Sequence, residues 1–103
     1  MFDITLREDG MVSLAGRLDA AQAPRAQELL DTLEGRCEID MSGLEYISSA
    51  GLGVLLRTHK RLMARGSGVR LVKVDNHIND ILTYSGFDRL FEVSTLKSGP
   101  DER

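Results

Sequence analysis

The chain has 103 residues, of which 42% are hydrophobic, and its formal net charge at pH 7 is −3. This length suits one domain with its own core, and the acidic balance argues against nucleic acid as the main partner. No apolar run is long enough to cross a bilayer, no signal-peptide pattern opens the chain, and one cysteine builds neither a disulfide nor a zinc site alone. We therefore expect a cytoplasmic protein without a metal, a cofactor or direct membrane insertion.

Eight secondary-structure elements are predicted, separated by segments that contain glycine, serine, aspartate or asparagine. In chain order they are strands over 2–7 and 11–16, a helix over about 21–33, a strand over 36–41, a helix from 49 to about 65, a strand over 69–74, a helix over about 77–84 and a strand over 91–94. The strands follow from alternating or continuous apolar residues, and the helices from apolar residues spaced three and four apart.

The first half of the chain contains three local signals. Asp9-Gly10 predicts a hairpin turn between the first two strands, and Asp19 is expected to cap the helix that follows, because its carboxylate can accept N–H groups of the first turn. Pro24 is tolerated only in the first turn of that helix. Cys37, on the third strand, is interpreted as a small core residue rather than a reactive thiol.

Ser42-Gly43 is predicted to form a turn before the second helix. The apolar stripe of that helix consists of Leu52, Leu55, Leu56, His59, Leu62 and Met63. On this stripe His59 is interpreted as a core histidine, whereas His77 is expected to be exposed. Three cations lie off the stripe and are interpreted as a solvated face or as rim contacts for an acidic partner: Arg57, Lys60 and Arg61.

The order β-β-α-β-α-β-α-β predicts an α/β fold with a mixed sheet of about five strands. The βαβ units imply parallel pairing with right-handed crossovers, and the initial hairpin adds an antiparallel edge. The helices are expected mainly on one face. We expect one domain over residues 1–96, followed by a polar tail over 97–103 that has little to bury and should be mobile.

The stretch from Asp40 to Leu56 carries the strongest indication of function. It passes from strand to helix through Ser48-Ser49-Ala50-Gly51. A helix N-terminus offers unpaired N–H groups and a partial positive charge, which suits a hydroxyl that carries a phosphate. On the residues alone, Ser49 is first interpreted as an N-cap, a role compatible with being an acceptor. Gly51 and Gly53 favour either close helix–sheet packing or close approach of a partner.

Three separated motifs resemble the STAS domain family, the sulfate-transporter and anti-sigma-factor-antagonist domains. They are residues 16–19 (GRLD), 40–53 (DMSGLEYISSAGLG) and 85–91 (SGFDRLF). They lie in the family's order and extend over nearly the whole chain. Because no transporter segment precedes them, the chain looks most similar to the stand-alone bacterial anti-sigma factor antagonists.

This resemblance implies a partner switch in signal transduction and transcription regulation. In the family, the unphosphorylated antagonist binds an anti-sigma serine kinase of the GHKL type, phosphorylation of a serine at the start of the second helix ends the binding, and a PP2C-type phosphatase reverses it. The matching serine here is Ser49. Ser48 replaces the family's acidic residue and becomes an alternative acceptor, and Ala50 replaces the next hydroxyl. The residues expected to contact the partner are Asp19, Asp40, Ser48, Ala50, Gly51, Leu52, Gly53 and Arg57.

Two other functions compete with this one. Ser49-Ala50-Gly51 resembles part of a nucleophile elbow, but Ile47 stands where a glycine is needed and no histidine is obviously placed as a base. Gly51-Leu52-Gly53 is half of a dinucleotide motif, with Leu56 at the third glycine position. We therefore predict that the protein is not an enzyme. A scaffold or accessory subunit of a signalling assembly or a lipid transporter, without a phosphorylation cycle, stays open as the alternative.

Overall fold

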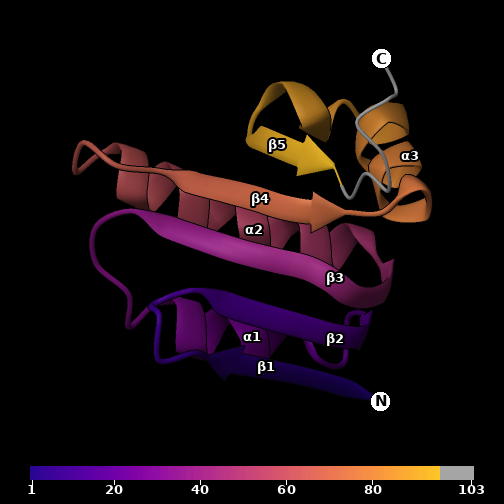
Figure 1. The fold of residues 1–103 in the computed structure, drawn as a ribbon, viewed down its shortest axis with the longest axis horizontal. Coiled ribbons are helices and arrows are strands. Elements are labelled where there is room, and N and C mark those ends of the chain that lie inside the picture. Colours follow the sequence, from indigo (N-terminus) through magenta and orange to yellow (C-terminus); the bar gives the residue numbers. More distant parts are fainter. Residues whose placement is uncertain (96–103) are drawn as a thin grey trace.

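One mixed sheet forms the base of the fold, as Figure 1 shows for the computed structural model, which describes residues 1–95. Its strands lie in the order β1-β2-β3-β4-β5. The bounds are β1 Phe2–Leu6, β2 Val12–Leu18, β3 Cys37–Ile47, β4 Val69–Val74 and β5 Glu92–Thr95. β1 pairs antiparallel with β2, and the remaining neighbours are parallel. The predicted fold class is thereby confirmed.

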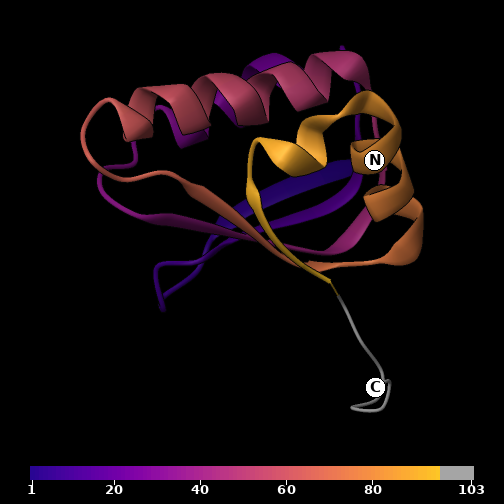
Figure 2. The same ribbon diagram turned by 90° about the horizontal axis from the view of Figure 1, so that it is seen from above.

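The helices lie on one face of this sheet, which Figure 2 shows edge-on. They are α1 Ala23–Leu30, α2 Ser49–Met63 and α3 Asn76–Ser85, followed by the short 3-10 helix η1 Phe87–Arg89. The order of the strands explains the one-sided cover. Each parallel connection moves one strand further in the same direction, and right-handed crossovers in one direction place every helix on the same side.

The third strand is longer than its sequence indicates. The predicted turn at Ser42-Gly43 is wrong, because both residues lie inside β3. The pairing with β2 shifts register twice along this strand, once between Ser13 and Ala15 and once between Gly16 and Arg17. Such bulges absorb extra residues without ending a strand. Gly43 also lies close to β2, because a Cβ there would be 3.0 Å from the carbonyl oxygen of Leu14.

The first helix ends at Leu30 rather than near residue 33, and it begins at Ala23 with Pro24 in its first turn, as predicted. Its C-terminal end is held from α2: Arg61 donates hydrogen bonds to the carbonyl oxygens of Leu30 and Leu33, at 2.9 and 3.0 Å. The interpretation of Arg61 as part of a solvated face is therefore wrong. Its guanidinium satisfies carbonyl groups that a helix end otherwise leaves unpaired.

The core lies between the sheet and the helices and consists of apolar side chains from both layers. Cys37 is buried there, and burial raises the pKa of its thiol to about 11, as expected of a core cysteine. His59 is half-buried. Its Nδ1 accepts the N–H of Val69 at 2.9 Å, and its ring lies 4.9 Å from that of Phe91. Met63, predicted to join the apolar stripe, is 56% exposed.

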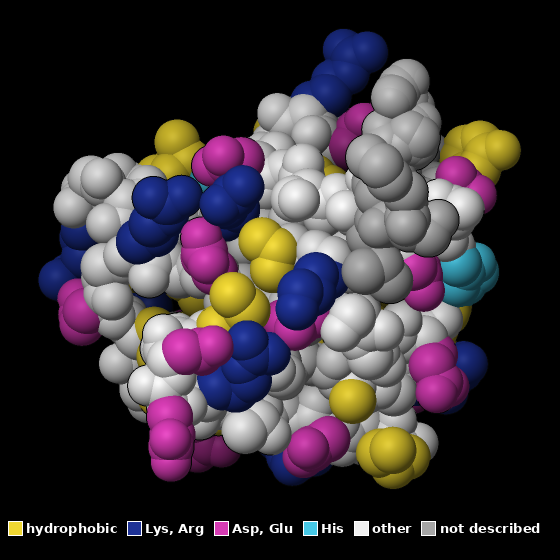
Figure 3. Space-filling view, in the orientation of Figure 1, with side chains coloured by type: hydrophobic (Ala, Val, Ile, Leu, Met, Phe, Trp, Pro, Cys, Tyr) yellow, Lys and Arg dark blue, Asp and Glu magenta, His cyan; other side chains and the backbone are white. Residues whose placement is uncertain are grey.

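The opposite face of the sheet carries no helix, and Figure 3 looks directly onto it. Lysine, arginine, aspartate and glutamate side chains alternate across its middle in that view. Arg70 on β4 pairs with Glu38 at 3.3 Å and with Glu92 at 3.5 Å. The charge of Arg70 is therefore balanced by its neighbours on β3 and β5.

Candidate functional site

The candidate site lies at the edge of the sheet where the parallel strands end. Leu18 at the end of β2 is paired with Ile47 at the end of β3. The N–H of Ser48 donates to the carbonyl oxygen of Leu18 at 2.9 Å, so the start of α2 is fastened to β2. Asp19 follows Leu18 directly. The topology thus brings Asp19 and the Ser48-Ser49 pair to one edge, toward which the arrows of β2 and β3 point in Figure 1.

The two serines have different structural roles. Ser48 is the N-cap of α2, and its hydroxyl oxygen accepts the N–H of Gly51 at 3.2 Å. Ser49 is the first residue of the helix and is exposed. The interpretation of Ser49 as the N-cap is therefore wrong by one residue. The hydroxyl of Ser48 serves the helix, whereas that of Ser49 faces outward.

Gly51 is required by the packing of the helix start. A Cβ on this residue would lie 2.8 Å from the carbonyl oxygen of Leu18, 2.8 Å from the Leu18 side chain and 2.8 Å from that of Ile47. Real Cβ atoms do not approach backbone so closely, so only glycine allows α2 to lie this near to β2. This explains half of the Gly51-Leu52-Gly53 pattern by packing.

Gly53 is different, because no backbone crowds it. A Cβ there would meet only the guanidinium of Arg57, with Nη1 at 3.3 Å. Arg57 is exposed and lies back along the helix toward Gly53, while its Nε donates to Oε1 of Gln27 on α1 at 3.0 Å. Gly53 therefore leaves an open strip on the surface of α2, partly covered by one flexible side chain.

The other predicted contact residues on α2 are less accessible. Leu52 is 5% exposed and belongs to the core, and Gly51 is buried as well. Ala50 is half-buried against the core. At this helix start Ser49 and Arg57 are therefore the exposed residues, while Gly53 is half-buried like Ala50 but carries no side chain that would keep a partner away.

Asp19 belongs to the turn before α1. Its carboxylate accepts the N–H of Gln22 at 3.2 Å, and its carbonyl oxygen accepts the N–H groups of Gln22 and Ala23. Gln22 is itself the N-cap residue of α1 and makes no side-chain capping bond. Asp19 therefore supports the helix start from further back in the chain than a cap in the usual position.

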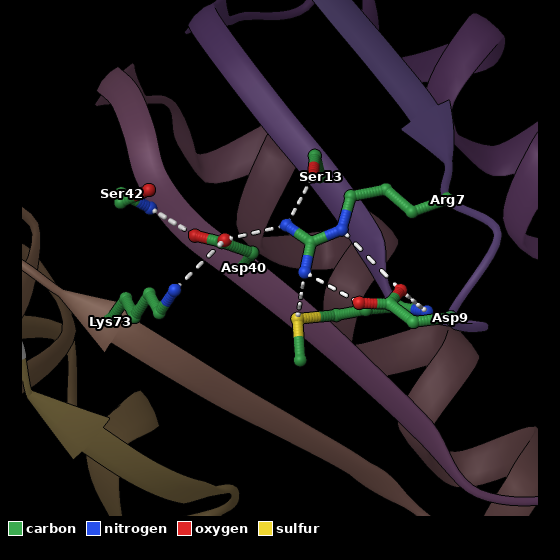
Figure 4. Close-up of polar contacts among 7 residues, drawn as sticks. Arg7, Asp9, Ser13, Asp40, Ser42 and Lys73 are labelled. Carbon is green, nitrogen blue, oxygen red and sulfur yellow. Dashed lines mark hydrogen bonds and ion pairs between the residues drawn. The ribbon is translucent and has the colours of Figure 1, made fainter.

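Asp40 does not lie at this edge. It is 6% exposed on the helix-free face, nearer the start of β3 than its end, and Figure 4 shows the cluster around it. Seven residues of β3 lie between it and Ser48, which places the two roughly 20 Å or more apart at about 3.3 Å per residue. Its carboxylate accepts from Arg7 Nη1 at 2.9 Å and from the N–H of Ser42, also at 2.9 Å. Lys73 Nζ lies 3.9 Å away.

This cluster determines the protonation of Asp40. Burial alone would raise the pKa of the Asp40 carboxyl. Hydrogen bonds from Ser42 and Arg7, together with the charge of Lys73, outweigh burial and hold that pKa below its usual range. Arg7 also pairs with Asp9 at 2.9 Å and donates to Ser13 at 3.1 Å. Asp40 is thus an ionised anchor that joins the hairpin to the sheet.

Sequence reasoning left one neighbouring element out of the site. The start of α3 lies at the same edge, because β4 is parallel to β3 and ends there. Asp75 is its N-cap and accepts the N–H of Ile78 at 2.9 Å, and Asn76 and His77 are exposed. The Asp75-Asn76 pair signalled the cap, but its position at the edge that carries Ser49 depends on the strand order. The exposure expected for His77 is confirmed.

No metal site accompanies this edge: within residues 1–95 no group of three histidine, cysteine, aspartate or glutamate side chains is arranged to hold an ion. None of the helices described there is both long and apolar enough to cross a membrane.

Comparison with known sequences gives a consistent picture. Residues 3–93 match the family described as "Mlab, STAS domain". A Bordetella bronchiseptica protein named as a candidate anti-sigma factor antagonist, BtrV, is 34% identical over 95 residues, which is 86% of this chain and 82% of that protein.

Solved structures share the fold. An anti-sigma factor antagonist from Mycobacterium paratuberculosis superposes with a TM-score of 0.76 at 21% identity, over 91% of this chain and 84% of that one. The anti-sigma factor antagonist SpoIIAA superposes in its unphosphorylated form with a TM-score of 0.68 and 15% identity, over 99% of this chain and 93% of its own. Its phosphorylated form gives 0.65 and 16%, over 99% and 98%.

Proposed function

The chain belongs to the STAS domain family, and we propose that it acts there as a bacterial anti-sigma factor antagonist in a phosphorylation-controlled partner switch. In this proposal the unphosphorylated protein binds a cytoplasmic anti-sigma serine kinase of the GHKL type. Phosphorylation of Ser49 ends the binding, and a PP2C-type phosphatase restores it. The protein itself binds and is modified, and it catalyses no reaction.

The observation that carries the proposal is that two adjacent hydroxyl groups have different structural roles. Ser48 accepts the N–H of Gly51 and so is engaged by the helix, whereas Ser49 is exposed at the first helical position. A kinase needs an accessible hydroxyl, and the helix N-terminus tolerates the added negative charge with a gain of about 0.3–1 kcal/mol. This favours Ser49 over Ser48 as the acceptor.

In this proposal Ser48 takes over the capping role of the family's acidic residue at the same position. Aspartate and serine are both strong N-cap residues, because each offers a side-chain oxygen to the N–H groups of the first turn. Ser48 makes this contact. The substitution thus preserves the geometry of the helix start and removes one negative charge beside Ser49.

The switch is expected to act at the interface rather than through refolding. A phosphate adds about −1.5 to −2 charges and three acceptor oxygens. A change from nearly fully bound to nearly fully free needs about 5.5 kcal/mol of differential affinity, far above the helix-dipole contribution. Steric exclusion and desolvation of the phosphate against the partner must supply most of it. The strip formed by Ser49 and Gly53 lies where a partner's backbone could approach closely.

Support for this interpretation comes from the relatives. BtrV is named as an anti-sigma factor antagonist candidate, and SpoIIAA is known in a phosphorylated and an unphosphorylated form. The shared fold supports the use of the same surface here, and the matching of Ser49 to the family's acceptor rests on its place two residues before Gly51.

Incubation of the protein with ATP and a GHKL-type anti-sigma kinase from the same organism, followed by phosphopeptide mapping, tests the proposal. We expect one phosphate, at Ser49. The Ser48→Asp variant is the matched control, because it keeps a capping oxygen and removes the rival hydroxyl. Phosphorylation of Ser48 in the wild type contradicts the assignment, and so does a Ser48→Asp variant that takes up no phosphate at all.

A binding experiment separates the switch from the alternative of a scaffold or accessory subunit. The switch requires that Ser49→Ala retains the kinase and Ser49→Asp releases it. If both variants instead hold the same transporter or scaffold subunit equally well, the protein works without a phosphorylation cycle.

A further inference from the structure

Three residues follow one another along one side of α2, with the first and the last about 80° apart around its axis. Ser49, Gly53 and Arg57 are spaced four apart, and each step of four residues turns the helix by only about 40° beyond a full turn. Side chains on a helix lean toward its N-terminus. Arg57 accordingly lies back over Gly53, with Nη1 3.3 Å from the position that a Cβ of Gly53 would occupy. Its guanidinium thus lies about one turn nearer to Ser49 than its own Cα does.

A set of hydrogen bonds already holds Arg57 in this direction. Its Nε donates to Gln27 Oε1 at 3.0 Å. The amide of Gln27 is held in turn by Asp31 at 2.9 Å and by Thr58 at 3.1 Å. Among residues 1–95, neither Nη group of Arg57 makes a hydrogen bond or an ion pair. The guanidinium is therefore positioned through one nitrogen, while its two outer nitrogens are available.

The distance between the two residues allows contact after modification. Eight helical residues span about 12 Å along the axis. Nη1 of Arg57 already lies over Gly53, which is four residues, or about 6 Å along the axis, from Ser49. A phosphoserine side chain reaches about 5 Å, because its bonds of about 1.5 Å run in a zigzag, and a hydrogen bond adds about 3 Å. Because Gly53 has no Cβ, no side chain at that position stands between them. Arginine's planar fork matches phosphate oxygens better than a lysine ammonium does.

We propose that Arg57 is the chain's own receptor for the phosphate on Ser49, with its Nη groups pairing the phosphate across Gly53 while Gln27 keeps hold of Nε. This inference rests on the proposed phosphorylation of Ser49 and specifies the contact that the phosphate then makes. The pairing keeps the phosphate against α2 and partly neutralises its charge, so that the phosphate is bound by a residue of its own chain. Arg57 also ceases to be available as a contact for an acidic partner surface.

The test uses the full chain with phosphoserine placed at position 49 by genetic code expansion, and follows the phosphate by 31P NMR as a function of pH. A nearby guanidinium favours the dianion and so lowers the second phosphate pKa, which is ordinarily about 6. We expect that pKa to rise by about 0.5 pH unit in Arg57→Gln, as fits an exposed pair, and to lie in between in Arg57→Lys. The Nε–H resonance of Arg57 should also shift when the phosphate is present.

Lys60→Gln is the matched control, because it removes one cation from the same helix, nearly one turn further from Ser49 and exposed like Arg57. It should leave the phosphate pKa within about 0.1 unit of the wild type. An unchanged pKa in Arg57→Gln, or an equal shift in Lys60→Gln, overturns the inference. Because no kinase is used, this result is independent of the proposed function, which fails instead if the kinase neither binds the protein nor phosphorylates Ser49.

Discussion

Gly51 faces the carbonyl oxygen of Leu18 so closely that a Cβ would lie 2.8 Å from it. This contact sets the distance between α2 and β2 and thus the position of Ser49. It is reinforced by the hydrogen bond from Ser48 N–H to the same carbonyl oxygen, at 2.9 Å. The contacts of Ser48 and Gly51 with the backbone of Leu18 lie on either side of Ser49 and therefore fix the position of the helix start.

The Gly51→Ala substitution should lower the free energy of unfolding by about 1–3 kcal/mol, because the methyl group meets backbone that cannot move without shifting the helix. Urea denaturation followed by circular dichroism measures the effect. A stability equal to that of the wild type would show that α2 can shift outward at no cost.

Gly53→Ala is the contrasting change and should raise stability by about 0.5–1 kcal/mol, because alanine favours the helix over glycine. The only group near the new methyl is the end of Arg57, which can move aside. The same variant should bind the kinase partner more weakly if the open strip is a contact surface. A loss of stability in the same denaturation assay would mean that Arg57 is held more firmly than its exposure indicates.

Ser48→Ala should lower the free energy of unfolding by about 1 kcal/mol, because the N–H of Gly51 loses its acceptor. Ser48→Asp should keep or exceed wild-type stability, since it caps and places a negative charge at the helix N-terminus. Ser49→Ala should be nearly neutral, because its hydroxyl is exposed. Thermal unfolding of the three variants checks this order, and a larger loss in Ser49→Ala than in Ser48→Ala would reverse the assignment of the cap.

Asp40 should make stability depend on acid. Because its folded pKa is lowered, its ionised form stabilises the fold fully above its ordinary pKa of about 4, and this stabilisation disappears as pH falls through the lower folded value. Asp40→Asn should be less stable by about 1–3 kcal/mol at pH 7, since hydrogen bonds to a buried carboxylate are lost. Its stability should then fall less steeply below pH 4. If the free energy of unfolding has the same pH dependence in the wild type and in Asp40→Asn, Asp40 does not have this role.

Arg61→Ala should destabilise the protein by about 1–3 kcal/mol, because it removes two hydrogen bonds from a charged donor to the end of α1. Lys60→Ala, at the neighbouring exposed position, should change stability by less than about 0.5 kcal/mol. Guanidinium denaturation of both variants gives the comparison. Equal effects would mean that α1 is held by its apolar contacts alone.

Local pattern was sufficient to predict the element order and the parallel, one-sided architecture, because each strand and helix has its own period and each connection one favoured hand. The turn at Ser42-Gly43 was wrong because a bulged strand and a turn both accommodate such residues, and only pairing with β2 distinguishes them. Serine and glycine in sequence carry no information about a neighbouring strand.

The site, too, could be predicted from the sequence only in part. The motifs placed Ser49 at the helix start. Which of the two serines caps the helix depends, however, on the residue at which β3 ends. Asp40 lies in the same motif as Ser49, yet strand length and side-chain alternation carry it to the other face of the sheet. The strained backbone of Lys73, with φ of 56°, has no sequence signal, because lysine rarely adopts that conformation. The expected tail over residues 97–103 lies outside the described part of the chain.

The bonds from Arg61 to the end of α1 also bear on the order in which the chain folds. A helix of eight residues is marginal on its own, and the groups that complete α1 come from a helix some thirty residues later in the chain. We therefore expect α1 to become stable only once β3 and α2 have docked. During synthesis the N-terminal part of the chain would then stay incompletely folded until α2 has been made. The helix that carries Ser49 is thus also the one whose Arg61 completes the end of α1.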